Sequence, residues 1–343
     1  MNIPNYDKNI VVGNLRSDIR ESITALEHYT ITDETVLSLY PALFDGGTVF
    51  AIAPGESSKS LDVANDIARD MLKKGFKRNT TIVAVGGGVV SDVAGFVASI
   101  YMRGIDWVCV PTTLLAQVDA SNGGKTGVNI EDYKNVIGSF YLPRQIFCDI
   151  NILATLDDRQ WLSGVGEILK TALLNQELWQ YFGDNLQLLM QRDQKVVQKV
   201  VTACMAIKSN VVALDFKDKG LRQNLNIGHT IGHALESLDN FALTHGEYVL
   251  LGINIETTLF SHEIDVEYLQ NLRLTLKKIS PNMMDFSVNK LLKFAAQDKK
   301  NKREEITFVV PVALGQVKTF SLKHDELKKK LNSLKDSFFL NNS

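Results

Sequence analysis

The stretch from Thr80 to Met102 constrains the fold of this chain more than any other, because Asp92 is its single charged residue. Its length and apolar character imitate a membrane span, but three consecutive glycines at 86–88 and a carboxylate near the middle are unsuited to a lipid-facing helix. A β-branched apolar run, a glycine turn and a second apolar run instead predict a buried strand that leads into a buried helix. Such a strand is typical of a parallel α/β sheet, and we expect a soluble protein.

The rest of the first 150 residues repeats this alternation of strand and helix patterns. Val49–Ala53 and Thr81–Val85 are nearly continuous apolar runs, and weaker versions lie at Trp107–Val110 and Ile146–Ile150. Between the first two runs, Ser60–Lys74 carries apolar residues at the spacing of an amphipathic helix. Alternating β and α elements joined by short loops predict a parallel-sheet α/β domain.

Long helical patterns follow after residue 150. They predict helices at Gln160–Asn175, Gln194–Leu214 and Thr230–Leu238, a strand at Ile306–Val312 and a charged surface helix after Lys323. We therefore expect two domains, an α/β domain over residues 1–150 and a mainly α-helical domain over residues 151–343.

Composition narrows the class of partner and the compartment. The 37 Lys and Arg residues nearly balance the 39 Asp and Glu residues, so the net charge is −2 and nothing favours a nucleic-acid partner. Cys109, Cys148 and Cys204 form no CxxC pair, which predicts reduced core residues of a cytoplasmic protein. The first residues lack a basic segment followed by an apolar block, so we expect no secretory signal and no membrane partner.

The glycine turn is the first candidate binding site. Glycines allow a close backbone approach and a helix start offers free N–H groups, so such a turn can hold a pyrophosphate. As a dinucleotide fingerprint it is incomplete, since Gly86, Gly88 and Ser91 read GxGxxS without the third glycine. A tight turn with no ligand is equally compatible with these residues. Asp106 precedes a strand rather than ending one, so it has little weight as a ribose-binding acid.

A second candidate is the polar segment Gln117–Gly127, which combines Asp119, Lys125 and three glycines in eleven residues. With Arg103 and the pair Lys134–Asn135, it has the groups of a phosphate or carboxylate site. A solvated polar loop is the alternative, and the residue types alone do not decide between the two.

Histidine spacing gives the sharpest signal of chemistry. Four of the six histidines fall within 34 residues, and His229 and His233 lie four apart, on one face of a helix. His245 follows in the sequence Thr-His-Gly-Glu, and the candidate carboxylate is Glu167. Imidazoles from a helix and a nearby loop, with one carboxylate, predict a divalent-metal site with an open position. Buried structural histidines are the alternative, and His262 is interpreted as a surface or packing residue.

Glu167 and Lys170, three residues apart on an otherwise apolar helical pattern, have two interpretations. One is a surface ion pair. The other places both on an inward face, where burying the charges requires a metal or an anionic ligand as partner. Lys208 and Arg222 lie in a segment whose charge pattern is ordinary.

Taken in order, these segments closely resemble the 3-dehydroquinate synthase family of sugar phosphate cyclases. The resemblance extends from Asp33 to Pro311 with similar spacing. Its strongest stretches are PGESSKS, AVGGGVVSDVAGFVAS, MRG, VPTTLLAQVDASNGGKTGVN, KNVIGSFYLP, GEILK, GLR, LNIGHTIGHALES, HGE and DKK. A single glycine turn has little weight, but the ordered set is highly specific.

The resemblance implies a Rossmann-like NAD-binding domain, a helical metal-binding domain and a homodimer. It implies a divalent metal, zinc or cobalt, held by Glu167, His229 and His245, with His233 as a catalytic residue rather than a ligand. The implied cofactor-binding positions are Asp33, Glu56, Lys59, Gly87, Gly88, Val89, Asp92, Thr112, Thr113, Lys125, Lys134 and Thr155. The implied catalytic and substrate-binding positions are His233, Lys170, Asn135, Lys125, Asp119, Arg103, Lys208, Arg222 and Asn226, with Arg103 reaching in from the other subunit.

The implied activity converts 3-deoxy-D-arabino-heptulosonate 7-phosphate to 3-dehydroquinate and phosphate in the shikimate pathway of aromatic amino acid biosynthesis. NAD is reduced only transiently, so the net class is a carbon–oxygen lyase. The lysine and arginine cluster favours such an anionic substrate over a neutral polyol. The alternatives are another sugar phosphate cyclase, such as 2-deoxy-scyllo-inosose synthase, and a metal-dependent polyol dehydrogenase. A non-catalytic NAD-binding protein of this fold is disfavoured because all the site residues are present together.

The chain departs from the family pattern at a few positions. Gly166 stands where the family commonly has Ala before the metal glutamate, and Thr171 and Ala172 replace the residues usual after the helix lysine. Asp218 occupies a position where Glu is usual, so its side chain has a shorter reach. Thr307 falls where a basic phosphate contact is common, and Lys302 or Arg303 is the expected substitute.

Overall fold

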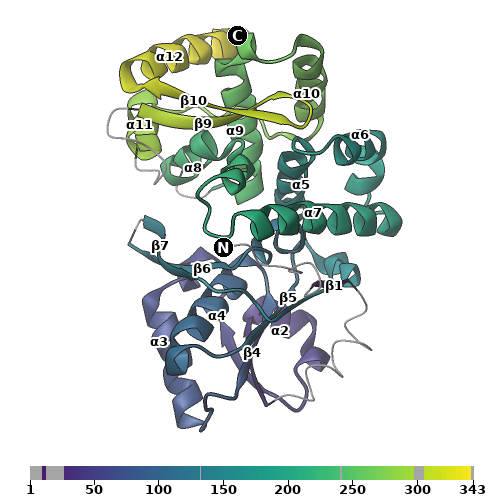
Figure 1. Ribbon diagram of the computed structural model, residues 1–343, viewed down its shortest axis with the longest axis vertical. Helices are drawn as coiled ribbons and strands as arrows, with labels where there is room; N and C mark the ends of the chain where they lie inside the picture. The colour runs from purple at the N-terminus through teal and green to yellow at the C-terminus, as the bar shows by residue number, and fades with distance from the viewer. Residues whose placement is uncertain (1–9, 13–26, 132, 240–241, 297–304, 341–343) are drawn as a thin grey trace. The chain divides into compact units, whose positions relative to one another are not determined.

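The amino-terminal part of the chain contains a parallel β-sheet (Figure 1). Its six strands follow the spatial order β1-β8-β5-β4-β2-β3. The computed structural model describes residues 10–12, 27–131, 133–239, 242–296 and 305–340. The strands of this sheet are β1 (Ile10–Val12), β2 (His28–Asp33), β3 (Thr48–Ile52), β4 (Thr81–Gly86), β5 (Trp107–Pro111) and β8 (Gln145–Cys148). Every residue of β4 is buried, which explains why its sequence is a continuous apolar run. The strands predicted around residues 49–53, 81–85 and 107–110 are confirmed, and the one predicted at 146–150 ends earlier, at Cys148.

Helices α2 (Glu34–Leu39), α3 (Leu61–Lys73) and α4 (Gly88–Ile100) alternate with these strands. The predicted amphipathic helix is α3: the Ser60 hydroxyl accepts a hydrogen bond from the Val63 N–H at 3.3 Å and so caps its start. Its buried face consists of Ala64, Ile67 and Met71. Helix α4 begins directly after the glycine turn and packs on β4, as the strand–turn–helix interpretation of residues 80–102 predicted.

The carboxyl ends of β2 and β4 lie side by side where the strand order reverses. β2 pairs with β3 on one side and with β4 on the other, and the chain leaves β2 and β4 in opposite directions across the sheet. Open α/β sheets bind ligands in the crevice at such a point. Asp33 ends β2 and the glycine turn ends β4, so the topology places two predicted cofactor positions at the same edge.

Between β5 and β8 the chain forms a turn of π-helix, η6 (Ala116–Ala120), and an antiparallel hairpin, β6 (Lys125–Ile130) and β7 (Tyr133–Phe140). The sequence pattern predicted no strands here. Gly127 and Gly138 face each other across the hairpin, and glycines in both strands remove the alternation by which a half-buried strand is recognised.

The chain divides into two compact units: residues 1–161 with 192–218, and residues 162–191 with 219–343. Helix α7 (Gln194–Leu214), found at its predicted residues, belongs to the first unit, where Asn122 Nδ2 donates hydrogen bonds to Met205 O at 3.1 Å and Ser209 Oγ at 3.0 Å. Of the helices in the described part of the chain, α7 is long and apolar enough to cross a bilayer. Half of its most apolar stretch is buried in the structure, a property shared by core helices of soluble proteins. The domain boundary after residue 150 stays a prediction.

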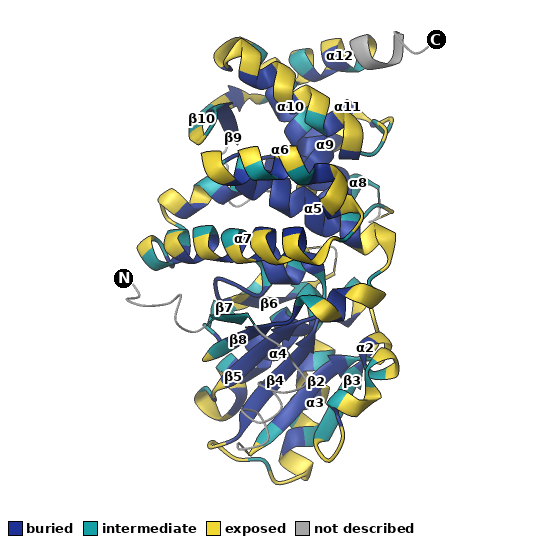
Figure 2. Ribbon diagram, turned by 90° about the vertical axis from the view of Figure 1, so that its right-hand side faces the viewer, coloured by how far each residue is buried: buried dark blue, intermediate teal, exposed yellow. Residues whose placement is uncertain are grey.

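The second unit is mainly helical, which confirms the predicted fold class. Its elements are α5 (Asp158–Ala172, from Leu162 onward), α6 (Gln176–Met190), α8 (His229–Leu238), α9 (His245–Leu259), α10 (Val266–Ile279), α11 (Val288–Ala296), α12 (His324–Leu340) and the hairpin β9 (Glu305–Ala313) and β10 (Gln316–Lys323). Helix α9 is buried along nearly its whole length (Figure 2). Helices α8, α10 and α12 and strand β9 pack against it.

Candidate metal centre and anion-binding groups

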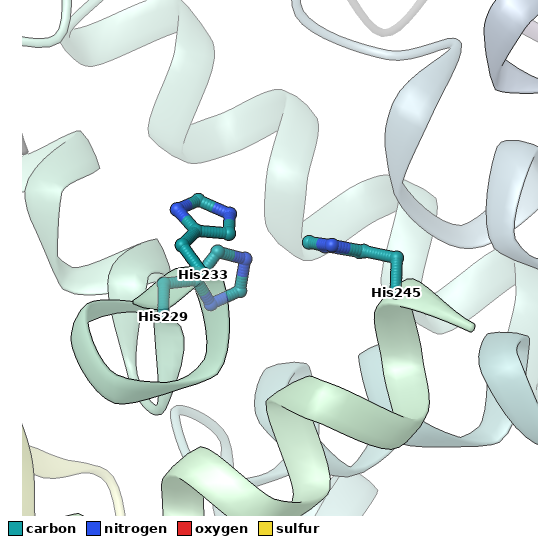
Figure 3. A group of neighbouring side chains, drawn as sticks. All are labelled: His229, His233 and His245. Carbon is teal, nitrogen blue, oxygen red and sulfur yellow. The ribbon is translucent and has the colours of Figure 1, made fainter. Parts of the chain in front are cut away.

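Three histidines converge in the second unit. His229 is the first residue of α8, His233 lies one turn further along the same helix, and His245 is the first residue of α9 (Figure 3). One nitrogen from each ring lies within 4.8 Å of those from the other two. The ring centroids are 5.1, 5.4 and 5.5 Å apart. This spacing allows imidazoles to share one ion.

Contacts at the far nitrogens orient two of these rings. His229 Nδ1 lies 3.0 Å from the carbonyl oxygen of Ile227, which can only accept, so Nδ1 carries the hydrogen and Nε2 keeps its lone pair. His245 Nδ1 lies 3.6 Å from Glu236 Oε2. The Nε2 atoms of both rings face Glu167 Oε1, at 3.7 Å for His229 and 3.3 Å for His245. The two imidazole nitrogens and the carboxylate oxygen point into one space, and a contact at Nδ1 orients each ring. Such groups form the donor set of a divalent-metal site.

The carboxylate of this cluster is deeply buried. The side chains of Glu167 and Lys170, an ion pair on α5, are 1% and 2% exposed, so the surface ion-pair interpretation is wrong and the inward-facing one is right. Neither oxygen of Glu167 accepts a hydrogen bond of regular geometry from the described residues, although a buried carboxylate is costly without such partners. A cation between Glu167 and the two imidazoles would supply the missing contact, so the residues present fit a metal ion.

Burial and close charges determine the protonation of the cluster. Burial acts to raise the pKa of Glu167, but the Lys170 ammonium and the two imidazoles hold it well below its usual range. Burial holds the pKa of His229 well below its usual value, so its ring is neutral. Burial acts in the same direction on His245, but Glu167 and Glu236 outweigh it and raise the pKa of His245 to about 10. Without metal, His245 therefore carries a proton that a bound ion would displace.

Glycines let the backbones of α5 and α9 touch beside these donors. The Gly246 N–H donates to Ser163 Oγ at 3.1 Å, and a Cβ on Gly246 would lie 1.9 Å from the Ser163 carbonyl oxygen. A Cβ on Gly166 would lie 2.4 Å from the Gly246 carbonyl oxygen. Glu167 and His245 each adjoin one of these glycines and are drawn together. The Gly246 carbonyl thus occupies the space of the methyl group that alanine would carry at position 166.

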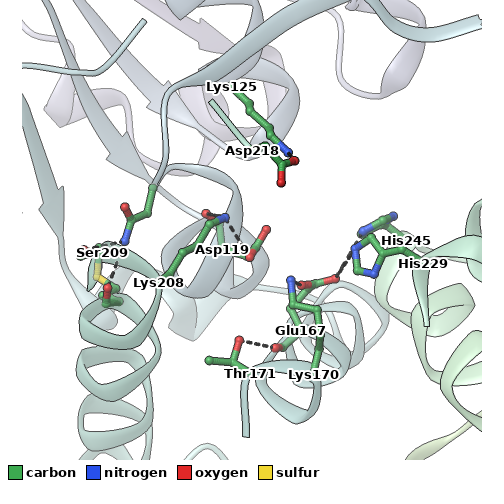
Figure 4. A network of polar contacts seen from close by, with 12 residues as sticks. Asp119, Lys125, Glu167, Lys170, Thr171, Lys208, Ser209, Asp218, His229 and His245 are labelled. Carbon is green, nitrogen blue, oxygen red and sulfur yellow. Dashed lines mark hydrogen bonds and ion pairs between the residues drawn. The ribbon is translucent and has the colours of Figure 1, made fainter. Parts of the chain in front are cut away.

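Two lysine–aspartate pairs lie in the first unit (Figure 4). Lys208 Nζ, which is almost fully buried, contacts the backbone oxygen of Asp119 at 2.7 Å and its Oδ1 at 2.8 Å. Lys125 Nζ lies 2.5 Å from Asp218 Oδ2. Asp218 has a left-handed backbone with φ of +55°, and despite its short side chain it reaches this lysine. The polar segment after β5 is therefore anchored by ion pairs to Asp218 and to Lys208 of α7, and the two ammonium groups are the kind that an anion requires.

Several predicted cofactor positions are linked to one another in the first unit. Lys59 Nζ lies 2.5 Å from Asp92 Oδ2, and burial raises the pKa of Asp92 despite this ammonium. Glu56 Oε1 accepts a hydrogen bond from Asn129 Nδ2 at 2.8 Å and lies 3.7 Å from Lys134 Nζ. These contacts connect the helix after the glycine turn, the loop after β3 and the β6–β7 hairpin.

The remaining predicted cofactor positions surround the ends of β2, β4 and β5. Asp33 caps α2 through its side chain, and the Thr155 hydroxyl lies 2.7 Å from that of the tyrosine that ends α2. The Thr112 N–H donates to the Gly86 carbonyl at 2.9 Å. Thr113 abuts the glycine turn, since a Cβ on Gly87 would lie 3.1 Å from its methyl carbon. Gly88 and Val89 are the first residues of α4.

Two predicted substrate positions of the first unit have a left-handed backbone. Arg103 is exposed, with φ of +68°, in the short turn η5 (Tyr101–Arg103) after α4. Asn135 has φ of +55°, and its N–H donates to Asn129 Oδ1 at 2.9 Å. Residues rarely adopt this conformation without support from their surroundings.

Other predicted positions belong to the second unit. Arg222 is buried in η8 (Leu221–Asn226), and Asn226 Nδ2 donates to the backbone of the same turn. The carbonyl of Thr307 on β9 accepts a hydrogen bond from the Thr230 hydroxyl at 2.9 Å, which places it beside the start of α8. Lys302 and Arg303 lie outside the described residues.

Two supporting residues of these sites were not predicted, and one acid near His245 has another role. Glu247 does not join the histidines; it accepts hydrogen bonds from the Thr244 N–H at 2.7 Å and hydroxyl at 2.8 Å, and so caps α9. Glu236 and Asn129, which contact His245 and Glu56, were not identified. Glu236 had a usable signal, because it lies three residues after His233 on an otherwise apolar helix and so shares the face of the histidines.

Known proteins that are similar in sequence or structure indicate the family of this chain. The 3-dehydroquinate synthase N-terminal family model matches residues 49–163, and the 3-dehydroquinate synthase C-terminal model matches residues 164–301. A 3-dehydroquinate synthase from Alkaliphilus metalliredigens (strain QYMF) is 41% identical over 309 residues, 87% of each chain. A solved structure of 2-epi-5-epi-valiolone synthase from Streptomyces hygroscopicus subsp. jinggangensis 5008, with NAD⁺ and Zn²⁺ bound, is 24% identical with a TM-score of 0.86 and 96% coverage of each chain. One of 2-deoxy-scyllo-inosose synthase, complexed with carbaglucose-6-phosphate, NAD⁺ and Co²⁺, is 24% identical with a TM-score of 0.83, covering 94% of this chain and 96% of that one.

The two solved structures establish the class of fold, an α/β domain with a parallel sheet joined to a helical domain. The family models and the relative are more specific. The chain belongs to the 3-dehydroquinate synthase family.

Proposed function

We propose that this chain is a 3-dehydroquinate synthase, which converts 3-deoxy-D-arabino-heptulosonate 7-phosphate to 3-dehydroquinate and inorganic phosphate in the shikimate pathway. The observation that carries the proposal is the convergence of Glu167, His229 and His245 beside Lys170, in a chain of this family. The reaction breaks a carbon–oxygen bond with no net oxidation, so the enzyme is a phosphate-eliminating lyase.

In this proposal Glu167, His229 and His245 hold a zinc or cobalt ion, and the carboxyl edge of the sheet around the glycine turn holds NAD. When bound, the ion would polarise a substrate hydroxyl and NAD would provide a reversible redox partner. The Lys170 ammonium lowers the pKa of Glu167, and this carboxyl group therefore stays ionised. His233, whose ring lies 5.1 Å from that of His229, is assigned to moving a proton at the substrate.

Nine charged and polar residues of this chain, His233 among them, are assigned to catalysis or to the substrate. Lys125, Lys208 and Arg222 bind its phosphate and carboxylate groups, and Arg103, Asp119, Asn135, Lys170 and Asn226 complete the set. The Lys125–Asp218 pair supports this assignment, because the Lys125 ammonium in it binds a carboxylate. An anionic substrate group would take the place of Asp218.

We also propose that the enzyme is a cytoplasmic homodimer in which Arg103 serves the neighbouring subunit. Its exposure in a left-handed turn supports a role outside its own chain. Cys109, Cys148 and Cys204 are all buried free thiols, which supports a reducing compartment. Sedimentation equilibrium would test the dimer.

The deciding experiment is a coupled phosphate-release assay with the heptulosonate phosphate, with and without NAD and a chelator. The proposal expects NAD-dependent phosphate release, no lasting NADH absorbance, and loss of activity on chelation. Release only from other phosphorylated sugars would favour another sugar phosphate cyclase, and NADH accumulation with a polyol would favour a dehydrogenase. His245→Ala should lose metal and phosphate release together while NAD binding stays measurable; turnover in metal-free buffer would show the ligand assignment to be wrong.

A further inference from the structure

A buried glutamate outside the proposed ligand set holds the start of the helix that carries His229 and His233. Glu256 lies on α9, and it is 1% exposed. Its Oε2 accepts a hydrogen bond from the Gly228 N–H at 3.1 Å, and its Oε1 accepts one from the Ile231 N–H at 2.9 Å. Gly228 is the N-cap of α8 and Ile231 is its third residue, so one carboxylate satisfies two amides at the start of the helix.

Helix α8 has no side-chain cap of its own. Its N-cap is a glycine with φ of +73°, which offers no side-chain acceptor. The first N–H groups of a helix lack intrahelical acceptors, and the positive end of the helix dipole favours an anion. The close approach of α9 permits this remote cap: a Cβ on Gly252, one turn before Glu256, would lie 1.9 Å from the Gly228 carbonyl oxygen.

This cap acts on the backbone from which a proposed ligand projects. His229 is the first residue of α8 and lies between the two amides that Glu256 binds. Its ring is further held by the Ile227 carbonyl, which belongs to the same short stretch. The direction of His229 Nε2 therefore depends on the conformation of residues 227–231.

The start of α9, the helix that carries the other proposed histidine ligand, is capped by a glutamate of its own first turn. His245 is the first residue of α9, whose capping box joins Thr244 and Glu247. Each proposed histidine ligand is thus the first residue of a helix whose start is closed by a glutamate. For α9 the glutamate lies three residues after the cap, and for α8 it comes from the neighbouring helix.

We infer that Glu256 is a positioning residue of the metal centre: by closing the start of α8, it fixes the backbone from which His229 reaches the ion. This inference rests on the metal site proposed above. Glu256 acts through His229 and binds neither ion nor substrate itself.

The test is Glu256→Gln, which keeps the volume but turns an NH₂ group toward a backbone N–H. Zn²⁺ affinity is measured by competition with a chromophoric chelator, and the geometry of the site by the visible spectrum of the Co²⁺-loaded protein. We expect Zn²⁺ affinity to fall by about tenfold or more, the usual effect of losing an outer partner of a metal ligand, together with a changed cobalt spectrum. The matched control is Asn175→Ala, which removes the side-chain cap of α6 in the same unit. It should lower the melting temperature and leave metal affinity and spectrum unchanged.

The outcomes separate this inference from the proposed function. If the unaltered protein binds neither Zn²⁺ nor Co²⁺, the proposed metal site is wrong. If it binds them and Glu256→Gln binds equally well with the same spectrum, or if Asn175→Ala weakens binding as much, the positioning role is wrong. Should Glu256→Gln fail to fold, hydrogen exchange in the metal-free, unaltered protein answers the same question. Slow exchange at the Ile231 amide supports a cap that Glu256 forms before metal binds. Exchange that is fast until metal is added overturns the positioning role of Glu256.

Discussion

Replacing Gly246 by alanine tests whether the contact between α5 and α9 sets the distance between Glu167 and His245. The new Cβ would lie 1.9 Å from the Ser163 carbonyl oxygen, and Cβ contacts under 3.0 Å essentially do not occur. Because the contacted atom belongs to the backbone, the two helices must move apart by about 1 Å at this point. His245, the preceding residue, moves with α9 and away from the carboxylate, from which its Nε2 is now 3.3 Å distant.

Two effects set the size of the change. Overpacking a buried contact costs about 1–3 kcal/mol, and loss of the hydrogen bond from the Gly246 N–H to Ser163 Oγ costs about 1 kcal/mol. Together they lower the free energy of unfolding by about 2–4 kcal/mol, which shifts the melting temperature of a unit of this size by roughly 5–15 °C. A displacement of about 1 Å exceeds the ~0.5 Å within which a site must be held. Zn²⁺ affinity should therefore fall by about 10–100-fold.

Thermal unfolding and chelator competition for Zn²⁺ measure the two effects separately. Gly183→Ala on α6 is the matched control, since a Cβ there would meet no atom within 4 Å. Alanine favours a helix over glycine, so this control should gain about 0.5–1 kcal/mol of stability and leave metal affinity unchanged. If Gly246→Ala melts and binds Zn²⁺ like the unaltered protein, the proposed dependence of the metal centre on this helix contact is refuted.

Three further changes probe the site and the sheet. Lys125→Ala should raise the KM for the heptulosonate phosphate at least about tenfold with little change in NAD affinity; equal losses would move Lys125 to the cofactor site. Glu236→Gln should weaken Zn²⁺ binding about tenfold, because His245 loses the carboxylate at its Nδ1; unchanged chelator competition would exclude that role. Burial acts to raise the pKa of Asp70, but hydrogen bonds from Lys74 and a buried tyrosine hold it below its usual value, so its contribution to stability is present at neutral pH and lost as pH falls below about 4. Asp70→Asn should therefore be less stable by up to about 1 kcal/mol in urea unfolding at pH 7, with a difference that shrinks in acid; a constant difference would contradict the ion-pair explanation.

Local patterns were sufficient for the elements whose burial is either continuous or follows the period of a helix. The continuous apolar run of β4, the capped amphipathic helix after Ser60 and the long helix α7 were each predicted close to their observed bounds. The β6–β7 hairpin was not, since paired glycines such as Gly127 and Gly138 leave no alternating pattern to recognise. The gathering of histidines was foreseeable because His229 and His233 share a helix face.

Which acid joins those histidines was not foreseeable from spacing. Glu247 is two residues from His245, yet it closes a helix, whereas Glu167 comes from another helix far away in the chain. Nothing in the neighbourhood of Glu256 along the chain indicates that it would bind the amide of Gly228.

By itself, the order of apolar runs, glycines and histidines determined the succession of strands and helices, the family and the types of ligand groups available. Only the tertiary structure decided which residues support the histidines from their far side, and whether Glu167 and Lys170 face water or the interior. The physical reason is distance along the chain, because the period of apolar residues indicates burial only within one helix or strand. The contacts at Gly166, Gly246 and Gly252 join backbones dozens of residues apart. These contacts set the positions of the metal-binding groups.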